Sequence, residues 1–302
     1  MIKNFLEVNE LLSNKLIENN SFCLMRIDNT AGYVMDCVYN GTIPVKEFYN
    51  EYTLIEGGVH PYDVNYGLTV VQPKTMEVMF NADILGFIDI SEILKNSSEF
   101  AKQYFDRPVF FKNDCEVLDP VILLKQTKIN NVLPWTSFLK GKKVLVLSSH
   151  VESIKYQWNK MDKIWGEDKD LIVPFELVDV IRTPYSPVWD NRQYENCNNW
   201  EELIEITKKR IDQYDYDVLL TGITTQSPFY AAHAKQQGKI GIQTGGTIQL
   251  FFGVKGTRWA KYTYTADCLE KINMPDWIFP FEIDKPQQQR QFNHLESSYA
   301  YW

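Results

Sequence analysis

Two polar segments that contain glycine follow two neighbouring apolar runs in the second half of this 302-residue sequence. Segment 221–227 has the sequence TGITTQS, and segment 244–247 has the sequence TGGT. Glycine lets a backbone approach a ligand closely, and the N–H groups at the start of a helix attract anions such as a diphosphate. Neither segment matches GxGxxG or GxxxxGK(S/T), so a dinucleotide or Walker-type site is not indicated. The two segments therefore predict either ordinary tight turns or a diphosphate cradle made by Gly222, Thr224, Gly245, Gly246 and Thr247.

Two basic side chains, Lys255 and Arg258, follow the second segment closely. They suit a clamp on a phosphate or carboxylate, which arginine binds with two parallel hydrogen bonds. The alternative is a solvated basic loop packed over Trp259. Gln249 lies between the TGGT segment and these two cations, and we predict that it lines the same pocket.

Another cluster of polar residues, SSHVES, follows the apolar run at 144–147. We predict Ser149 as a pocket residue; the alternative is that it caps the helix that begins here, which alone would explain the serines. His150 and Glu152 are candidates for a base that activates a hydroxyl group, because both side chains can accept a proton. The alternative for His150 is a structural role.

The first apolar run, 22–27, ends in the polar sequence Arg26-Ile27-Asp28-Asn29-Thr30. Asp28 has the chemistry to hold a divalent metal or to accept a proton from an incoming hydroxyl. The alternative is an Arg–Asp pair or a helix cap. We predict Arg26 and Asn29 as further pocket residues.

Composition excludes several classes of function. With 31 Lys and Arg against 39 Asp and Glu, the net charge is −8 and no basic run exists, so we expect no nucleic-acid partner and no polybasic membrane anchor. No stretch reaches about 18 consecutive apolar residues, and Glu7, Glu10 and Glu18 interrupt the place of a signal peptide. HExxH, GxSxG and paired-carboxylate signatures are absent. The five cysteines have no zinc spacing, which indicates reduced thiols in a cytoplasmic protein, in the host cytoplasm if the source is viral.

The elements that must position these residues alternate between strand and helix in the second half. This alternation predicts an α/β fold with a Rossmann-like, doubly wound, mostly parallel sheet and a helical N-terminal part. Region 44–135 is predicted as helices and short connections. The predicted strands are 22–27, 144–147, 172–181, 217–220 and 240–244, and the predicted helices are 3–20, 151–165, 200–214 and 229–238.

The length fits two domains or one large α/β domain. We predict an N-terminal α/β part at 1–135, a Rossmann-like part at 136–284 and a polar tail at 285–302. One continuous domain is the alternative.

Three pieces of the sequence resemble a family of glycosyltransferases, related to the GT-D type, that is encoded in capsule, lipopolysaccharide and large-virus glycan gene clusters. Family members show a PWT segment followed by LKGKKVLV, a P-F-x-x-S/T-I-x-x-Q turn, and the segment GKxAIHLGGxxQLLFGIKGxRW. The corresponding residues here are Pro134-Trp135-Thr136, Ser153-Ile154 with Gln157, and Gly238 through Trp259. The similarity covers 135–165 and 215–260, and it is weaker at 22–33 and at the terminal Tyr-Trp.

The resemblance implies transfer of a hexosyl or pentosyl group from a nucleotide-diphosphate sugar, such as a UDP-sugar, to a glycan acceptor. The product would be a surface polysaccharide or a glycoprotein glycan, and the part at 136–284 would bind the nucleotide sugar. Backbone N–H groups of the TGGT segment, with Lys255 or Arg258, would stabilise the leaving diphosphate. Asp28, His150 or Glu152 would activate the acceptor or bind Mn²⁺ or Mg²⁺.

This chain departs from the family pattern at two places. The family shows R-x-G-x-x-E near its N-terminus, whereas Ala31 stands here at the position of the Glu. Either Asp28 takes over as the metal ligand or metal dependence is lost. Residues 223–226 have the sequence ITTQ where the family has a G-A-Y-G-type turn, while the TGGT segment keeps its glycines. This combination fits an altered sugar specificity on a retained phosphate site.

Two other functions stay open. A catalytically inactive nucleotide- or sugar-binding protein of the same family is supported by Ala31. A methyltransferase on a similar scaffold would need a glycine-rich first turn, and SSHVES contains no glycine. The sequence also leaves open whether the chain forms a homo-oligomer.

Overall fold

The computed structural model describes residues 2–27, 72–79, 81–87, 109–110, 117–183, 200–223, 226–261 and 266–285. Within these ranges eight strands form one sheet in the order β1-β4-β3-β2-β8-β7-β5-β6, and each neighbouring pair is parallel. The strands are β1 (Ile2–Lys3), β2 (Phe22–Ile27), β3 (Ile84–Phe87), β4 (Val109–Phe110), β5 (Lys143–Ser148), β6 (Glu176–Arg182), β7 (Val218–Thr221) and β8 (Ile240–Gln243).

The sheet confirms the predicted α/β class. Strand 22–27 has its predicted bounds, and the four strands predicted in the second half are present with shifts of one to four residues at their ends. The prediction of only helices and connections in 44–135 is wrong, because β3 and β4 lie there. Strand β4 is only two residues long, and β3 lies in the stretch VMFNADILGFID, which alternates between apolar and polar residues and does not form a continuous apolar run.

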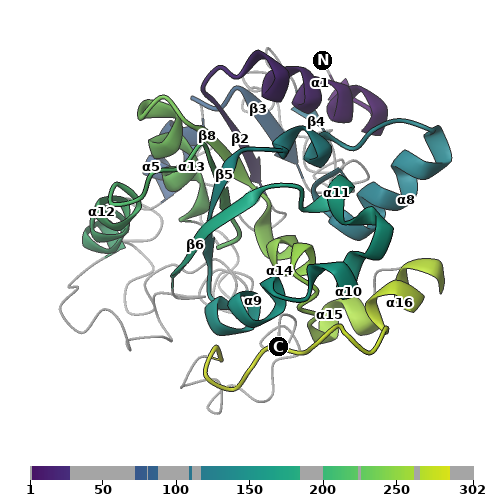
Figure 1. Cartoon of the computed structure of the whole chain (residues 1–302). Helices are drawn as coiled ribbons and strands as arrows, with labels where there is room; N and C mark the ends of the chain where they lie inside the picture. Colours follow the sequence, from purple (N-terminus) through teal and green to yellow (C-terminus); the bar gives the residue numbers. More distant parts are fainter. Residues whose placement is uncertain are drawn as a thin grey trace, which may run out of the picture.

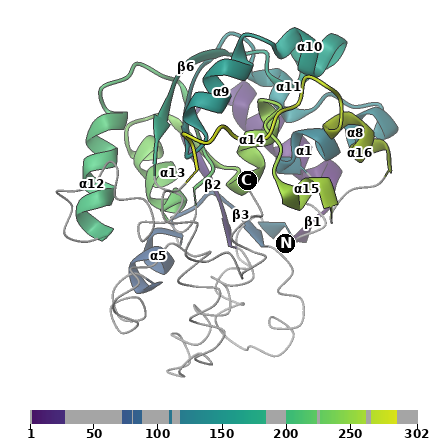
Figure 2. The same cartoon turned by 90° about the horizontal axis from the view of Figure 1, so that it is seen from below.

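Helices cover both faces of the sheet (Figures 1 and 2). One face packs against α5 (Gln72–Met79), α12 (Trp200–Ile211) and α13 (Ser227–Gln236), and the other packs mainly against α1 (Phe5–Glu18), α8 (Pro120–Asn130), α9 (Val151–Trp158), α10 (Met161–Trp165), α11 (Lys169–Ile172) and α14 (Ile248–Phe251). The short helices α15 (Thr257–Lys261) and α16 (Ala266–Ile272) follow, and 3-10 turns occupy Trp135–Leu139, Gly166–Asp168 and Gly245–Thr247.

Strand β5 shows how the sequence builds the two layers. Val144 and Val146 belong to the larger core cluster, whereas Leu145 and Leu147 belong to the cluster under α12 and α13. All four side chains are fully buried. Alternate side chains of a strand point to opposite faces, so a run apolar at every position is the pattern of a strand covered on both sides.

Helix α1 confirms the predicted N-terminal helix. Its first turn is a capping box, in which Asn4 accepts from the backbone N–H of Glu7 and the Glu7 carboxylate accepts from the backbone N–H of Asn4. The helix then buries Phe5, Val8, Leu12 and Leu16 against the core.

The single helix predicted at 151–165 is wrong, because the structure breaks it into α9 and α10. The two residues between them, Asn159 and Lys160, form the connecting turn. The turn re-aims the second piece so that Met161, Ile164 and Trp165 are all buried.

Strands of both predicted parts lie in the one sheet, since β2 pairs with β8. Where domains divide the chain stays a prediction. In the described ranges, Cys23 and Cys268 are buried and neither forms a disulfide. No helix of the described part has the length and apolar character needed to cross a membrane.

Candidate functional site

The carboxyl ends of β5 and β7 mark a switch in the winding of the sheet. From β5 the chain passes through α9 to β6 on one side, and from β7 it passes through α13 to β8 on the other. Ligands of open α/β sheets bind in the crevice at such a switch point. The fold therefore places the candidate site at this edge, where the polar residues at 148–153, 221–223, 226–227 and 244–247 also lie.

The two glycine-containing turns predicted as a cradle pack directly against each other. A Cβ added at Gly222 would lie 2.1 Å from Ile248 Cγ2 and 2.6 Å from the carbonyl oxygen of Gly245, so only glycine fits. The N–H of Thr244 donates to the carbonyl of Thr221 over 2.9 Å. The ends of β7 and β8 thus form one continuous surface.

Arg26, near the end of β2, contacts the end of β8 from the neighbouring strand. Its Nη1 donates to the carbonyl of Thr244 over 3.0 Å, and its backbone N–H donates to Oε1 of Gln243. Gly245 has φ +66°, and a Cβ there would lie 2.4 Å from Arg26 Nη1. Glycine is required by both the left-handed backbone and the guanidinium stacked on it. The structure therefore joins Arg26, Gly222 and Gly245.

Thr247 anchors the turn to the rest of the fold. Its hydroxyl is within hydrogen-bond distance of two carbonyls, those of Leu118 at 3.0 Å and Thr244 at 2.8 Å. Gly245, Gly246 and Thr247 are partly exposed and form the first turn of the helix that continues into α14. The leading N–H groups of a helix have no partner within the helix, so this turn presents donors to solvent.

The end of β5 brings a second group of predicted residues together. His150 is buried, and its Nδ1 lies 3.4 Å from the hydroxyl oxygens of both Ser148 and Ser149. The backbone N–H of His150 donates to the Ser148 hydroxyl. Two serines therefore hold the imidazole at the switch point, where it can act as a base.

The alternative of a capping role for Ser149 is wrong. His150 occupies the N-cap position of α9 without a side-chain bond, and the carboxylate of Asp284 caps the helix instead. Its two oxygens accept from the backbone N–H groups of Glu152 at 3.1 Å and Ser153 at 2.8 Å. This carboxylate comes from 131 residues further along the chain and supplies the negative charge that a helix N-terminus favours.

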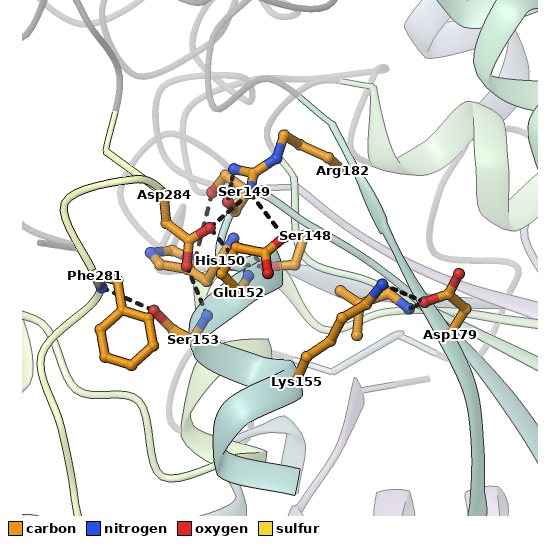
Figure 3. A network of polar contacts seen from close by, with 11 residues as sticks. Ser148, Ser149, His150, Glu152, Ser153, Lys155, Asp179, Arg182, Phe281 and Asp284 are labelled. Atoms are coloured by element: carbon orange, nitrogen blue, oxygen red, sulfur yellow. Dashed lines mark hydrogen bonds and ion pairs between the residues drawn. The ribbon is translucent and has the colours of Figure 1, made fainter.

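Arg182, the last residue of β6, completes this network (Figure 3). Its Nη2 lies 2.8 Å from Asp284 Oδ1 and 3.7 Å from Glu152 Oε1, and its Nη1 donates to the carbonyl of Ser149. The Asp284 side chain is completely buried and that of Arg182 is 12% exposed. Because this carboxylate already occupies the α9 N-terminus, that helix start is not open to an anion.

Two residues of the S/T-I-x-x-Q motif hold segment 276–285, which runs past α9 in Figure 1. The Ser153 hydroxyl accepts from the backbone N–H of Phe281. The Gln157 amide nitrogen donates to the carbonyls of Gly253 and Asp276. These two motif residues therefore build the scaffold beneath the site.

The contacts of Lys255 run to α16 and to the segment after it. The Lys255 ammonium donates to the carbonyl of Ile272 at the end of α16 and lies 5.3 Å from the centre of the Phe279 ring. Burial lowers its pKa below the ordinary value. Arg258 is exposed on α15. Arg26, in contrast, donates to this segment at the carbonyl of Thr244.

Several buried polar atoms at this edge have no hydrogen-bond partner within the described residues. They are Thr183 Oγ1, Gln226 Nε2, and both Nε2 and Oε1 of Gln249. These residues follow β6, β7 and β8 respectively. A buried polar group without a partner is uncommon and calls for a physical reason, such as a bound water, ion or ligand.

Asp28, Asn29 and Thr224 lie outside the described residues. Within the described ranges, no group of three or more His, Cys, Asp or Glu side chains has the arrangement of a metal site. The predicted Mn²⁺ or Mg²⁺ site at Asp28 stays a prediction.

Sequence reasoning missed Arg182 and Asp284. A charged residue at the end of an apolar strand is a usable sign of a site residue, and Arg182 follows the predicted strand 172–181 directly. No comparable sign marks Asp284, because its partners are brought to it only by tertiary structure.

No family model and no curated protein matches the chain. Two solved structures have a similar chain path. One is a new glycosyltransferase from Streptococcus sanguinis with domain of unknown function 1792, at 13% identity and a TM-score of 0.44, covering 91% of this chain and 94% of that one. The other is a domain of unknown function 1792 at 12% identity and a TM-score of 0.45, covering 96% of this chain and 93% of that one.

Proposed function

We propose that this chain is a glycosyltransferase that moves a sugar from a nucleotide-diphosphate sugar to a glycan acceptor. The observation that carries the proposal is the pair of interlocked glycine turns at the ends of β7 and β8, with the Arg26 guanidinium stacked on Gly245. The likeness of 135–165 and 215–260 to glycosyltransferase segments supports the same function.

The turn provides the chemistry that the leaving group needs. When the bond between the sugar and the diphosphate breaks, negative charge accumulates on the diphosphate oxygens. The N–H groups of Gly245, Gly246 and Thr247 would donate to those oxygens, and Arg26 places a positive charge beside them. Donors that are already oriented stabilise such charge without reorganising during the reaction.

His150 is proposed as the base that takes the proton from the acceptor hydroxyl. Imidazole accepts a proton near neutral pH, and the Ser148 and Ser149 hydroxyls orient its ring. Glu152 is less suited, because its carboxylate lies 3.7 Å from Arg182 and its side chain is half exposed. Both residues start α9 beside the switch point.

The test is a thermal-shift screen of the protein with nucleoside diphosphates and their sugars, with and without Mn²⁺ or Mg²⁺. A ligand that binds only the folded state raises Tm. We expect one nucleoside diphosphate and its sugars to raise Tm in the wild type and to lose most of that effect in Arg26→Ala. Lys143→Ala is the matched control, because this exposed cation lies at the opposite end of the sheet and should leave binding unchanged.

The outcomes separate the candidate functions. Binding followed by sugar transfer, or by slow hydrolysis of the donor, supports the glycosyltransferase. Binding without turnover in the presence of acceptor glycans supports the inactive binding protein. No shift with any nucleotide, with or without metal, contradicts both.

The finer features of the proposal are the donor and the setting. A UDP-sugar donor, a role in surface polysaccharide or glycoprotein glycan synthesis, and a cytoplasmic location all follow from the sequence resemblance or composition alone. The same screen names the nucleotide, and light scattering of the purified protein gives the oligomeric state.

A further inference from the structure

Gln249 is a buried carboxamide that the fold does not use. Its side chain is completely buried, and neither its oxygen nor its nitrogen has a hydrogen-bond partner within the described part of the chain. No other described carboxamide has both buried atoms unpaired; Gln157 and Gln226 each leave one atom unpaired. Leaving such groups unpaired destabilises the folded state, so a native protein keeps them for a reason.

The position of Gln249 in the helix points to that reason. It lies four residues after Gly245 and three after Gly246, on the short helix that continues from the partly exposed turn. Side chains of a helix lean toward its N-terminus and share a face with residues three and four positions earlier. Gly245 and Gly246 have no side chains to cover that face. Gln249 therefore lies within about one helical turn of the segment proposed for the diphosphate.

We propose that Gln249 is a substrate-binding residue, whose carboxamide is kept for a pair of hydroxyl groups on the nucleotide sugar. The inference rests on the proposed function. A carboxamide has one acceptor and two donor positions, and two neighbouring hydroxyls match it because one can donate while the other accepts. Both moieties that flank a diphosphate, the ribose and the transferred sugar, carry such pairs. Because the side chain is completely buried, the proposal requires it to turn toward residues 245–247 when the ligand binds.

The experiment compares Gln249→Met with Gln157→Met. Both glutamines are completely buried, but Gln157 donates to the carbonyls of Gly253 and Asp276. Methionine has nearly the same length and flexibility as glutamine and no strong polar atoms. Without ligand, Gln249→Met should raise Tm by roughly 2 °C because two unpaired polar atoms are removed, whereas Gln157→Met should lower Tm.

Binding of UDP and UDP-glucose is then measured by calorimetry. If the screen identifies another nucleoside diphosphate and its sugar, that pair replaces them. Gln249→Met should weaken Kd by about tenfold or more, which corresponds to the loss of one or two hydrogen bonds. Equal weakening for UDP and UDP-glucose assigns the hydroxyl pair to the ribose. Weakening for UDP-glucose alone assigns it to the transferred sugar.

Two results overturn the inference while leaving the proposed function intact. One is a fall in Tm for Gln249→Met as large as that for Gln157→Met, which would mean that the carboxamide has structural partners. The other is an unchanged Kd for both ligands in a variant that folds normally. Failure of the wild type to bind any nucleotide or nucleotide sugar instead overturns the proposed function, and this inference with it.

Discussion

The carboxylate of Asp284 should be one of the most important single groups for the stability of this protein. It is completely buried, accepts from two backbone N–H groups of α9 and pairs with Arg182, whose side chain is 12% exposed. Replacing it with alanine leaves a guanidinium and a helix end without their partner. Breaking a buried ion pair from one side costs about 3–5 kcal/mol. In a protein of this size that corresponds to a fall in Tm of roughly 5–8 °C.

The assay is urea and thermal unfolding of Asp284→Ala and Asp284→Asn, followed by far-UV circular dichroism. Asparagine keeps one oxygen that can accept from the helix but loses the charge, so its effect should lie between wild type and alanine. Glu282→Gln is the matched control. Glu282 lies in the same segment, but its side chain is 87% exposed and pairs only with Lys285 in the described residues, so its replacement should cost less than about 0.5 kcal/mol.

A second measurement tests the cause of the effect. Hydrogen exchange of the amides of Glu152 and Ser153 should accelerate in Asp284→Ala, because both lose their acceptor. The double variant with Arg182→Met should be less destabilised than the sum of the two single variants. If Asp284→Ala unfolds within about 1 kcal/mol of the Glu282→Gln control, the argument that this carboxylate holds segment 276–285 on α9 is refuted.

Three further outcomes are expected. Gly222→Ala should prevent nucleotide binding and lower Tm, because its Cβ would lie 2.1 Å from Ile248 Cγ2; unchanged binding in calorimetry would contradict the interlocked turns. Burial raises the pKa of the Cys23 thiol to about 11, so a thiol reagent at pH 8 should not react until the protein unfolds. The stability that the neutral thiol contributes should be lost between about pH 9 and 11, and this loss should be smaller in Cys23→Ala. Partial burial raises the pKa of Asp179, but its hydrogen bonds, above all the one from Lys155, have the larger effect and hold this pKa below its ordinary value. The stability of the fold should therefore decrease as the pH drops below about 4. In acid unfolding, Lys155→Met should make the stability less dependent on pH.

The parallel sheet could be predicted because its long strands are covered on both faces. Strands β5 and β7 are buried at nearly every position, which produces continuous apolar runs that end at glycine or polar residues. The turns that follow these strands contain glycine, threonine and serine, so the TGGT segment could be recognised from the sequence. Strand β4 has only two residues, and in β3 the sequence ILGF is interrupted by Gly86, so neither gave a continuous apolar run.

The site was predicted only where its residues are close in sequence. Arg26 and Gly245 could be named separately, but their stacking depends on the pairing of β2 with β8, which composition does not specify. The cap of α9 shows the same limit. Local reasoning selected Ser149 because serine is a good N-cap, whereas a carboxylate from far along the chain has the stronger interaction with the helix end.

The motif residues differ in whether their polar side-chain atoms form hydrogen bonds within the fold. Ser153 and Gln157 use their side chains to hold segment 276–285 and the chain after α14, so a change there should act first on stability. Gln249 belongs to the same set of motif segments, yet its carboxamide bonds to nothing in the described fold. A residue that only stabilised the fold would be replaced by an apolar side chain without loss, because an unpaired buried amide is unfavourable. A polar group at Gln249 is therefore best explained by a partner that arrives from outside the chain.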